Sequence, residues 1–142
     1  MTKLTGKCLC GSVEFTTPMP DHVDACHSSM CQNWTGGPFI GADYRSGGVE
    51  ITKGDTLQWY KSSDWAKRGF CNKCGTSLFY CLKDNDEFWA IAAGTLNIPS
   101  GQSLSKEIFI DEKPDYYALS GEHPRLTGQQ VWAQLQAGKD NE

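Results

Sequence analysis

Short apolar runs recur along the chain, and many of them alternate with polar residues at a period of two. Clusters of glycine, proline, asparagine and aspartate separate the runs, among them residues 46–48 and 84–86. Short alternating segments with closely spaced turn signals are typical of a mostly antiparallel β fold. The segments expected to form strands are 11–17, 37–44, 49–51, 57–60, 65–70, 76–82, 87–93 and 107–110.

The helix signal comes late in the chain. Thr127-Gly128-Gln129-Gln130 fits a capping box, and apolar residues follow at Val131, Trp132 and Leu135. Gly138 is in the position expected of a helix stop, and 139–142 would form a tail. The pattern therefore predicts a short C-terminal helix.

Length and charge limit the possible classes of protein. The chain has 142 residues, which is the size of one domain. Thirteen basic residues against 17 acidic ones give a net charge of −4, which lacks the basic footprint of nucleic-acid binding. No apolar run approaches the roughly 20 residues that span a bilayer, and residues 1–6 contain no signal-peptide core. We expect a soluble, cytoplasmic domain that binds neither nucleic acid nor membrane.

The seven cysteines change the picture, because their number is odd and six of them are clustered. In the cytoplasm thiols stay reduced, so clustered cysteines there bind metal more often than one another. Two clusters are alike: Cys8-Leu9-Cys10 and Cys71-Asn72-Lys73-Cys74 are each followed directly by glycine. A glycine there can adopt positive φ and let the backbone curl beneath a metal.

Two such pairs supply the four ligands of a tetrahedral zinc ion. The spacing therefore favours a structural zinc on Cys8, Cys10, Cys71 and Cys74. Two alternatives are a thioredoxin-like redox pair at Cys71 and Cys74, which leaves the other pair unexplained, and plain free thiols.

A third cluster contains Cys26 and Cys31, whose spacing is irregular for a structural zinc site. Two thiols with a nearby histidine or serine can form the open shell that a catalytic zinc requires. The alternative is two buried, reduced cysteines in a turn. In extended chain His27 would point away from Cys26, so a solvent-facing or backbone-bonded imidazole is expected rather than a ligand. Cys81 lies in an apolar run and is predicted to be a small buried side chain.

These segments together resemble the glutathione-dependent formaldehyde-activating enzyme family, also called the centromere protein V/GFA domain. The resemblance runs over about 4–125, leaving 126–142 as a C-terminal helix and tail. The segments that carry it are Cys8-Leu9-Cys10-Gly11-Ser12-Val13, Cys26-His27-Ser28-Ser29-Met30-Cys31, Thr35-Gly36-Gly37-Pro38-Phe39, Cys71-Asn72-Lys73-Cys74-Gly75 and Ile108-Phe109-Ile110-Asp111-Glu112-Lys113-Pro114.

The resemblance implies a zinc-stabilised, tent-like pair of antiparallel sheets with one structural zinc. It also implies a second, catalytic zinc held by three cysteines of a C-x-C-x-x-C segment. Such a zinc holds the sulfur of glutathione as a thiolate, which attacks formaldehyde to give S-hydroxymethylglutathione; the reverse reaction is that of a carbon–sulfur lyase. Trp34, Thr35 and Gly36 follow the metal segment and are candidates to line the pocket.

The sequence departs from this pattern at the middle ligand, which is Ser28 between Cys26 and Cys31. A neutral hydroxyl is a poor zinc ligand, so the affinity for zinc should fall. The predicted site is therefore Cys26, Ser28 and Cys31. The predicted function is a zinc-dependent lyase acting on a glutathione–aldehyde adduct, and the alternative is a non-catalytic zinc-stabilised binding module.

Overall fold

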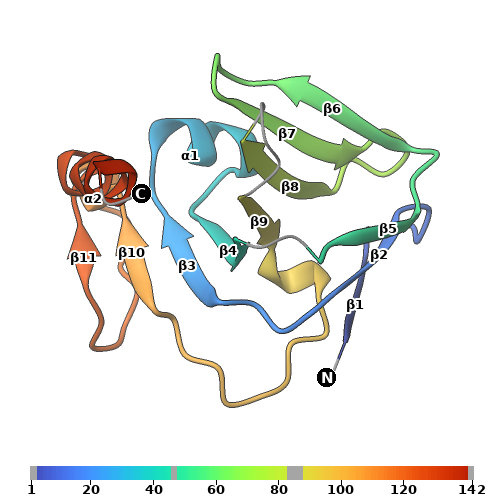
Figure 1. Cartoon of the computed structure of the whole chain (residues 1–142), viewed down its shortest axis with the longest axis horizontal. Helices are drawn as coiled ribbons and strands as arrows, with labels where there is room; N and C mark the ends of the chain where they lie inside the picture. The colour runs from blue at the N-terminus through green and yellow to red at the C-terminus, as the bar shows by residue number, and fades with distance from the viewer. Residues whose placement is uncertain (1–2, 46–47, 83–87, 141–142) are drawn as a thin grey trace. The chain divides into compact units, whose positions relative to one another are not determined.

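The structure is a computed structural model that describes residues 3–45, 48–82 and 88–140 (Figure 1). The chain forms two compact units. Unit 1 consists of Met1–Val23 and Gly41–Gln102, and unit 2 of Asp24–Ile40 and Ser103–Glu142. The turn signals at 46–47 and 84–86 and the start of the predicted strand at residue 87 lie outside the described residues.

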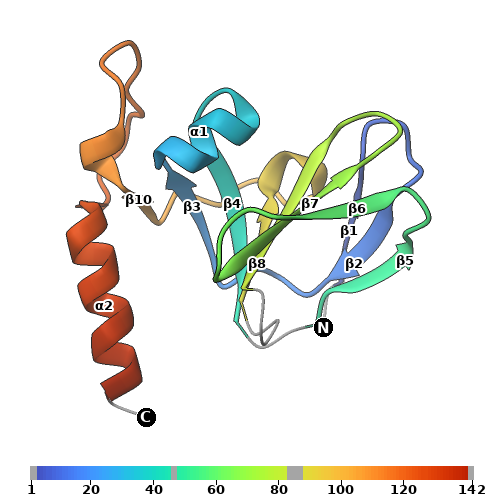
Figure 2. The same cartoon turned by 90° about the horizontal axis from the view of Figure 1, so that it is seen from above.

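Unit 1 is built from antiparallel strands. One sheet has the order β1-β2-β5, and the other strands follow the order β4-β9-β8-β7-β6, with β6, β7 and β8 side by side in Figure 2. A 3₁₀ turn at Ala93–Thr95 follows β9. The strands are β1 (Leu4–Lys7), β2 (Glu14–Thr17), β4 (Phe39–Tyr44), β5 (Glu50–Lys53), β6 (Leu57–Lys61), β7 (Ala66–Cys71), β8 (Ser77–Leu82) and β9 (Trp89–Ala92).

The core of unit 1 follows from the alternation of its strands. In β1 every second residue is buried, and β2 buries Phe15 and Thr17 in the same way. Phe15 meets Phe79 of β8 edge to face, with ring centroids 4.9 Å apart, a favourable aromatic geometry. Cys81 is fully buried, as predicted.

Unit 2 contains the parallel part of the fold. Strand β10 (Lys106–Ile108) pairs in parallel with β3 (His22–Cys26) and with β11 (Arg125–Leu126). Helix α1 (Ser29–Thr35) follows β3, a 3₁₀ turn covers Ile110–Glu112, and α2 (Gly128–Asp140) closes the chain. The mostly β fold with a C-terminal helix is confirmed, and its sheets are mixed rather than wholly antiparallel.

Helix α1 occupies the segment where the sequence predicted a turn or a metal loop. Ser28 is its N-cap, and Gly36 ends it in the left-handed conformation with φ 81°. At 7 residues the helix is too short to show an apolar period, so only its caps mark it in the sequence.

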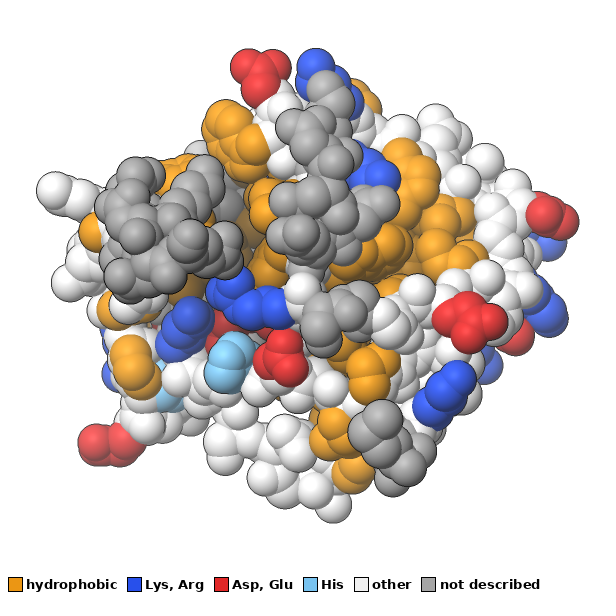
Figure 3. All heavy atoms as spheres, in the orientation of Figure 1, with side chains coloured by type: hydrophobic (Ala, Val, Ile, Leu, Met, Phe, Trp, Pro, Cys, Tyr) orange, Lys and Arg blue, Asp and Glu red, His pale blue; other side chains and the backbone are white. Residues whose placement is uncertain are grey.

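Charged side chains of both signs are interspersed on the face drawn in Figure 3, as far as its residues are described. No helix within the described ranges is long and apolar enough to cross a bilayer.

Helix α2 begins with the predicted capping box. The amide of Gln130 donates to Thr127 Oγ1 at 3.2 Å, and the amide of Thr127 donates to Gln130 Oε1 at 2.8 Å. The predicted stop at Gly138 is wrong, because the helix runs on to Asp140. One glycine lowers helix propensity by only about 1 kcal/mol, which does not force an end.

The capping box gives a direct test of α2. We expect Thr127→Ala to raise amide hydrogen exchange in the first turns of α2 and to cost about 1 kcal/mol of local stability, because the amide of Gln130 loses its partner. Thr127→Ser keeps the hydroxyl and should behave as the wild type. Equal exchange in all three proteins would contradict a stabilising cap.

Candidate functional site

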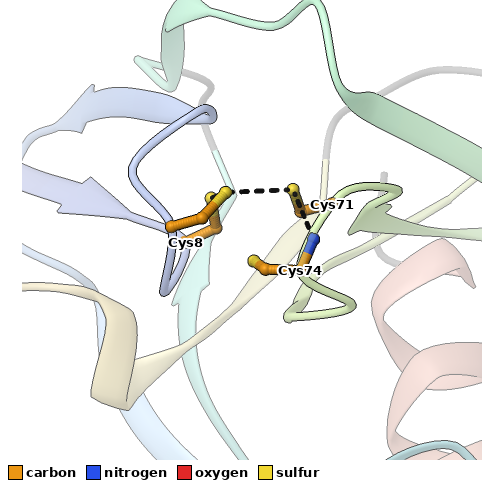
Figure 4. A group of neighbouring side chains, drawn as sticks. Cys8, Cys71 and Cys74 are labelled. Atoms are coloured by element: carbon orange, nitrogen blue, oxygen red, sulfur yellow. Dashed lines mark hydrogen bonds between the residues drawn. The ribbon is translucent and has the colours of Figure 1, made fainter.

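Two loops of unit 1 bring four thiols together. Cys8 and Cys10 lie in the loop after β1, and Cys71 and Cys74 lie where β7 turns toward β8 (Figure 4). All four Sγ atoms lie within 4.8 Å of one another. The Sγ atoms of Cys8 and Cys10 are 3.6 Å apart, and those of Cys10 and Cys71 are 3.8 Å apart. The two pairs that the sequence singled out thus converge.

Both loops turn at the glycine after the second cysteine, as the sequence predicted. Gly11 and Gly75 each have φ 81°, and a Cβ at either would meet no atom within 4 Å. The need for glycine is therefore conformational rather than steric. Each glycine amide donates to the carbonyl of the first cysteine of its loop, over 3.1 Å to Cys8 and 2.8 Å to Cys71.

Two threonines support the sulfurs, and the sequence analysis missed both. Thr76 Oγ1 accepts from the amide of Leu9 at 3.0 Å and lies 3.1 Å from Cys74 Sγ, so it joins one loop to the other. Thr56 Oγ1 lies 3.3 Å from Cys71 Sγ. Thr76 could have been found from the sequence, because it directly follows the Cys-Gly turn. No signal in the sequence pointed to Thr56, because it lies far from that turn in the chain.

These contacts favour the thiolate in the second loop. Hydrogen bonding from Thr56 lowers the pKa of Cys71, and hydrogen bonding from Thr76 lowers the pKa of Cys74 to about 5. Burial raises the pKa of Cys8. A metal ion requires its thiol ligands to be deprotonated. The lowered pKa values of Cys71 and Cys74 favour deprotonation of these two ligands.

The four thiols fit a tetrahedral metal ion. Four sulfurs at about 2.3 Å from a zinc ion lie about 3.8 Å from one another, close to the 3.6 Å between Cys8 and Cys10 and the 3.8 Å between Cys10 and Cys71. The cluster can therefore hold a metal ion, and sulfur donors in this number suit zinc.

The second set of predicted residues lies in unit 2. Cys26 ends β3, Ser28 caps α1, and Cys31 lies in the first turn of α1. Cys26 is half-buried and Cys31 is 6% exposed. The neighbouring Cys31 thiol and burial raise the pKa of Cys26.

His27 is fully buried, so the expectation of a solvent-facing or backbone-bonded imidazole is wrong. Its Nδ1 lies 2.8 Å from the Tyr117 hydroxyl and its Nε2 lies 2.7 Å from Glu107 Oε1. One of these partners, Glu107, lies on β10, and Tyr117 lies beyond it in the chain.

Glu107 is the centre of this buried network. Its Oε2 accepts from His123 Nε2 at 2.6 Å and from Arg125 Nε at 2.8 Å, while Oε1 accepts from His27. Burial acts to raise the pKa of Glu107, but the hydrogen bonds from His123 and His27 and the charge of Arg125 outweigh it and hold the pKa below its usual 4.5. From the sequence Glu107 is predicted only to lie in a strand, because the partners of a buried carboxylate depend on strand pairing.

The donors around Cys26 and Cys31 do not fit a three-ligand catalytic zinc. Ser28 Oγ accepts a hydrogen bond from the amide of Cys31 at 3.2 Å. Both ring nitrogens of His27 are hydrogen-bonded to other side chains, one to Tyr117 and one to Glu107. In the part of the chain that the structure describes, no third cysteine, histidine or carboxylate completes a ligand group with these two thiols. Two protein ligands fall short of the usual three.

Comparison with known proteins finds a matching family, a similar sequence and a similar solved structure. Residues 3–112 match the family described as glutathione-dependent formaldehyde-activating enzyme. A Schizosaccharomyces pombe protein described as an uncharacterised lyase is 24% identical over 132 residues, covering 92% of this chain and 96% of that protein. The crystal structure of a Rhodobacter sphaeroides protein aligns with a TM-score of 0.58 at 23% identity, covering 85% of this chain and 98% of that chain, which shows a shared fold.

Thr76 provides a test of the four-thiol cluster. We expect Thr76→Val to lower zinc affinity by about 10- to 100-fold, because Cys74 loses its hydrogen-bond donor and Leu9 its acceptor. Competition with a chromophoric chelator measures the affinity. Thr76→Ser is the matched control and should bind as the wild type; an unchanged affinity in the valine variant would contradict a supporting role for Thr76.

Glu107 predicts a dependence of stability on pH. Because its pKa in the folded protein lies below the usual 4.5, its charge stabilises the fold fully above that pH, and this contribution is lost as the pH falls through the lower folded pKa. We expect Glu107→Gln to lower the free energy of unfolding by about 3 kcal/mol at pH 7, and by progressively less as the pH falls below 4.5.

Urea unfolding of both proteins at a series of pH values measures this difference. A difference that stays constant from neutral to acid pH would show that the charge of Glu107 contributes nothing.

Proposed function

Because the chain belongs to the glutathione-dependent formaldehyde-activating enzyme family, we propose that it is a carbon–sulfur lyase acting on the adduct of glutathione, or a related thiol, with formaldehyde or another small aldehyde. The match over residues 3–112 carries this proposal, and the relative described as a lyase supports it. The reaction is of the S-hydroxymethylglutathione synthase type.

In this proposal Cys8, Cys10, Cys71 and Cys74 hold one structural zinc ion. The ion would tie the loop after β1 to the turn between β7 and β8, and such a site can contribute on the order of 10 kcal/mol to folding. The convergence of the four sulfurs, the two glycine turns and the supporting threonines all favour this role.

The reaction centre in this proposal is Cys26, Ser28 and Cys31. In the cleavage direction the bond between the thiol sulfur and the former carbonyl carbon breaks, the sulfur keeps the electron pair, and the hydroxyl proton of the adduct leaves. Synthesis is the reverse. The donors present do not fit the second zinc of the family pattern, so we route no step through a metal there.

The surroundings of the centre are fixed by hydrogen bonds and packing. Gln32 Nε2 donates to the carbonyl of His27 at 2.6 Å, and Thr35 Oγ1 donates to the carbonyl of Cys31 at 3.0 Å. The Trp34 ring stacks on Phe39 at 5.4 Å between centroids. We propose that Trp34, Thr35 and Gly36 border the substrate position while making these contacts.

The substrates are small molecules, and we propose no nucleic-acid or membrane partner, in line with the net charge of −4. We place the reaction in the cytoplasm, where the thiols that such a centre needs are kept reduced. Residues 4–125 form the zinc domain of the glutathione-dependent formaldehyde-activating type in this proposal, and 126–142 are a C-terminal helix and tail.

A second candidate function is a zinc-stabilised binding module without catalysis. The observation that favours it is the use of the Ser28 hydroxyl as a helix cap: the residue at the middle ligand position of the family pattern accepts a hydrogen bond from the amide of Cys31. The two candidates differ in whether the protein changes a reaction rate.

The test is exchange between glutathione, formaldehyde and their adduct at equilibrium, measured by NMR exchange spectroscopy with and without protein. We expect the wild type to accelerate exchange above the buffer rate and the Cys26→Ser, Cys31→Ser double variant to return it to that rate. Cys81→Ser, which removes a buried thiol outside both clusters, is the matched control and should keep the activity.

Ser28→Cys separates the two candidates further. It should raise both zinc content and exchange rate if the centre is a weakened form of the family site. Buffer-level exchange in the wild type and in this variant would favour the binding module.

A further inference from the structure

The turn that carries the proposed reaction centre lies between β3 and α1, and its residues His27 and Ser28 belong to neither element. Two other residues hold this turn. The amide of Ser29 donates to Glu112 Oε1 at 2.9 Å. Gln32 Nε2 donates to the carbonyl of His27 at 2.6 Å and to the carbonyl of Glu112 at 3.0 Å. All of these residues belong to unit 2, and Glu112 is the last residue of its 3₁₀ turn.

We propose that Glu112 and Gln32 are positioning residues, which hold the turn between Cys26 and Cys31 in the arrangement that the reaction needs. This inference rests on the proposed function, in which the two thiols belong to the reaction centre. Glu112 and Gln32 act through the main chain of the turn, so neither has to touch the substrate. Their role is separate from that of Ser28, whose hydroxyl caps α1.

The hydrogen bonds fall on main-chain groups that α1 cannot satisfy by itself. The amide of Ser29 is among the first four of the helix, which have no partner within it, and Glu112 supplies one. The first carbonyl of the helical ladder is that of Ser28, which accepts from the amide of Gln32 at 2.9 Å. The carbonyl of His27 comes before this ladder, and the side chain of Gln32 binds it instead. Side chains therefore fix the turn that leads from β3 into α1.

The turn depends on these contacts because α1 is short. A helix of 7 residues is not stable on its own and takes its stability from tertiary contacts. Cys31 lies in the first turn of α1, so a shift of that turn would move its sulfur relative to Cys26. Catalysis depends steeply on the placement of reacting groups, and a displacement of about 1 Å can lower a rate by up to about 100-fold.

The neighbouring acidic residue provides a matched control. Asp111 and Glu112 are consecutive in the 3₁₀ turn, and both are exposed. Asp111 Oδ1 accepts from the amide of Gly128 at 2.9 Å, and Gly128 is the first residue of α2. Each carboxylate thus binds the first amide of a different helix, Glu112 that of α1 and Asp111 that of α2. Loss of the Asp111 side chain should loosen α2 and leave the reaction centre unchanged.

The experiment compares variants of the full chain with the wild type. NMR exchange spectroscopy at several glutathione concentrations separates the maximal exchange rate from the half-saturating concentration. We expect Glu112→Ala to lower the maximal rate about 5-fold, the size of effect that a lost helix-cap hydrogen bond produces, with the half-saturating concentration unchanged. Glu112→Gln keeps a side-chain oxygen for the amide of Ser29 and should keep most of the rate.

Gln32→Glu tests the second contact. The change is nearly isosteric, but it removes both N–H donors and sets a carboxylate against the carbonyl oxygens of His27 and Glu112. We expect the maximal rate to fall about 10-fold or more. Asp111→Ala should keep the wild-type rate while amide hydrogen exchange rises at the start of α2. Circular dichroism checks that each variant is folded; if Gln32→Glu is not, the variants of the exposed Glu112 decide alone.

A second measurement does not depend on the proposed function. Iodoacetamide alkylates thiols, and peptide mass spectrometry gives the alkylation rate of each cysteine in the native protein. Cys31 is 6% exposed, so opening of the first turn of α1 would uncover it. We expect Glu112→Ala to speed the alkylation of Cys31 about 5-fold and Asp111→Ala to leave it unchanged.

The outcomes separate the two proposals. If the wild type accelerates exchange, the inference is overturned when Glu112→Ala keeps the wild-type rate, or when Glu112→Ala and Asp111→Ala lower the rate equally through a general loss of stability. If the wild type does not accelerate exchange, the proposed function fails and the alkylation decides. Faster alkylation of Cys31 in Glu112→Ala alone would then support the positioning of the turn, and an unchanged rate would overturn it.

Discussion

The convergence of four sulfur atoms within 4.8 Å of one another constrains the strands and loops of unit 1. The hydrogen-bonded thiols of Cys10 and Cys71 come from loops 61 residues apart in the chain, and each loop must turn at its glycine to aim its sulfurs inward. The sheets on either side then follow, because β1 and β2 flank one loop and β7 and β8 flank the other. Thr76 links the two loops by hydrogen bonds.

Much of this arrangement can be read from the sequence, because it rests on local chemistry. The Cys-Gly turns and the capping box of α2 depend on residues close together in the chain, and the structure confirms them. The alternating segments predicted the strands of unit 1 other than β1 for the same reason. The elements that the sequence did not predict, β1, β3, β11 and α1, are short, and their apolar pattern is too brief to stand out.

The site residues also differ in whether their roles depend on local sequence or on neighbouring segments. The sequence pairs Cys8 with Cys10 and Cys71 with Cys74, and the fold brings the pairs together. It could not show that Ser28 caps a helix or that His27 is buried, because both facts depend on what the neighbouring segments do. The substitution of serine for a cysteine ligand is visible in the sequence, but its meaning depends on the hydrogen bond that the hydroxyl makes to the amide of Cys31.

The buried carboxylate of Glu107 has a consequence for how the strands of unit 2 align. Strand β10 has three residues and β11 has two, so few ladder hydrogen bonds hold them in register. Glu107 lies opposite Ala25 on one side and Arg125 on the other. A shift of one residue would turn Glu107 to the other face of the sheet, away from His27, and would leave the buried His27 ring without the carboxylate that bonds its Nε2. A single acidic residue thus penalises misaligned strands, and the correct parallel alignment is selected by the cost of the alternatives.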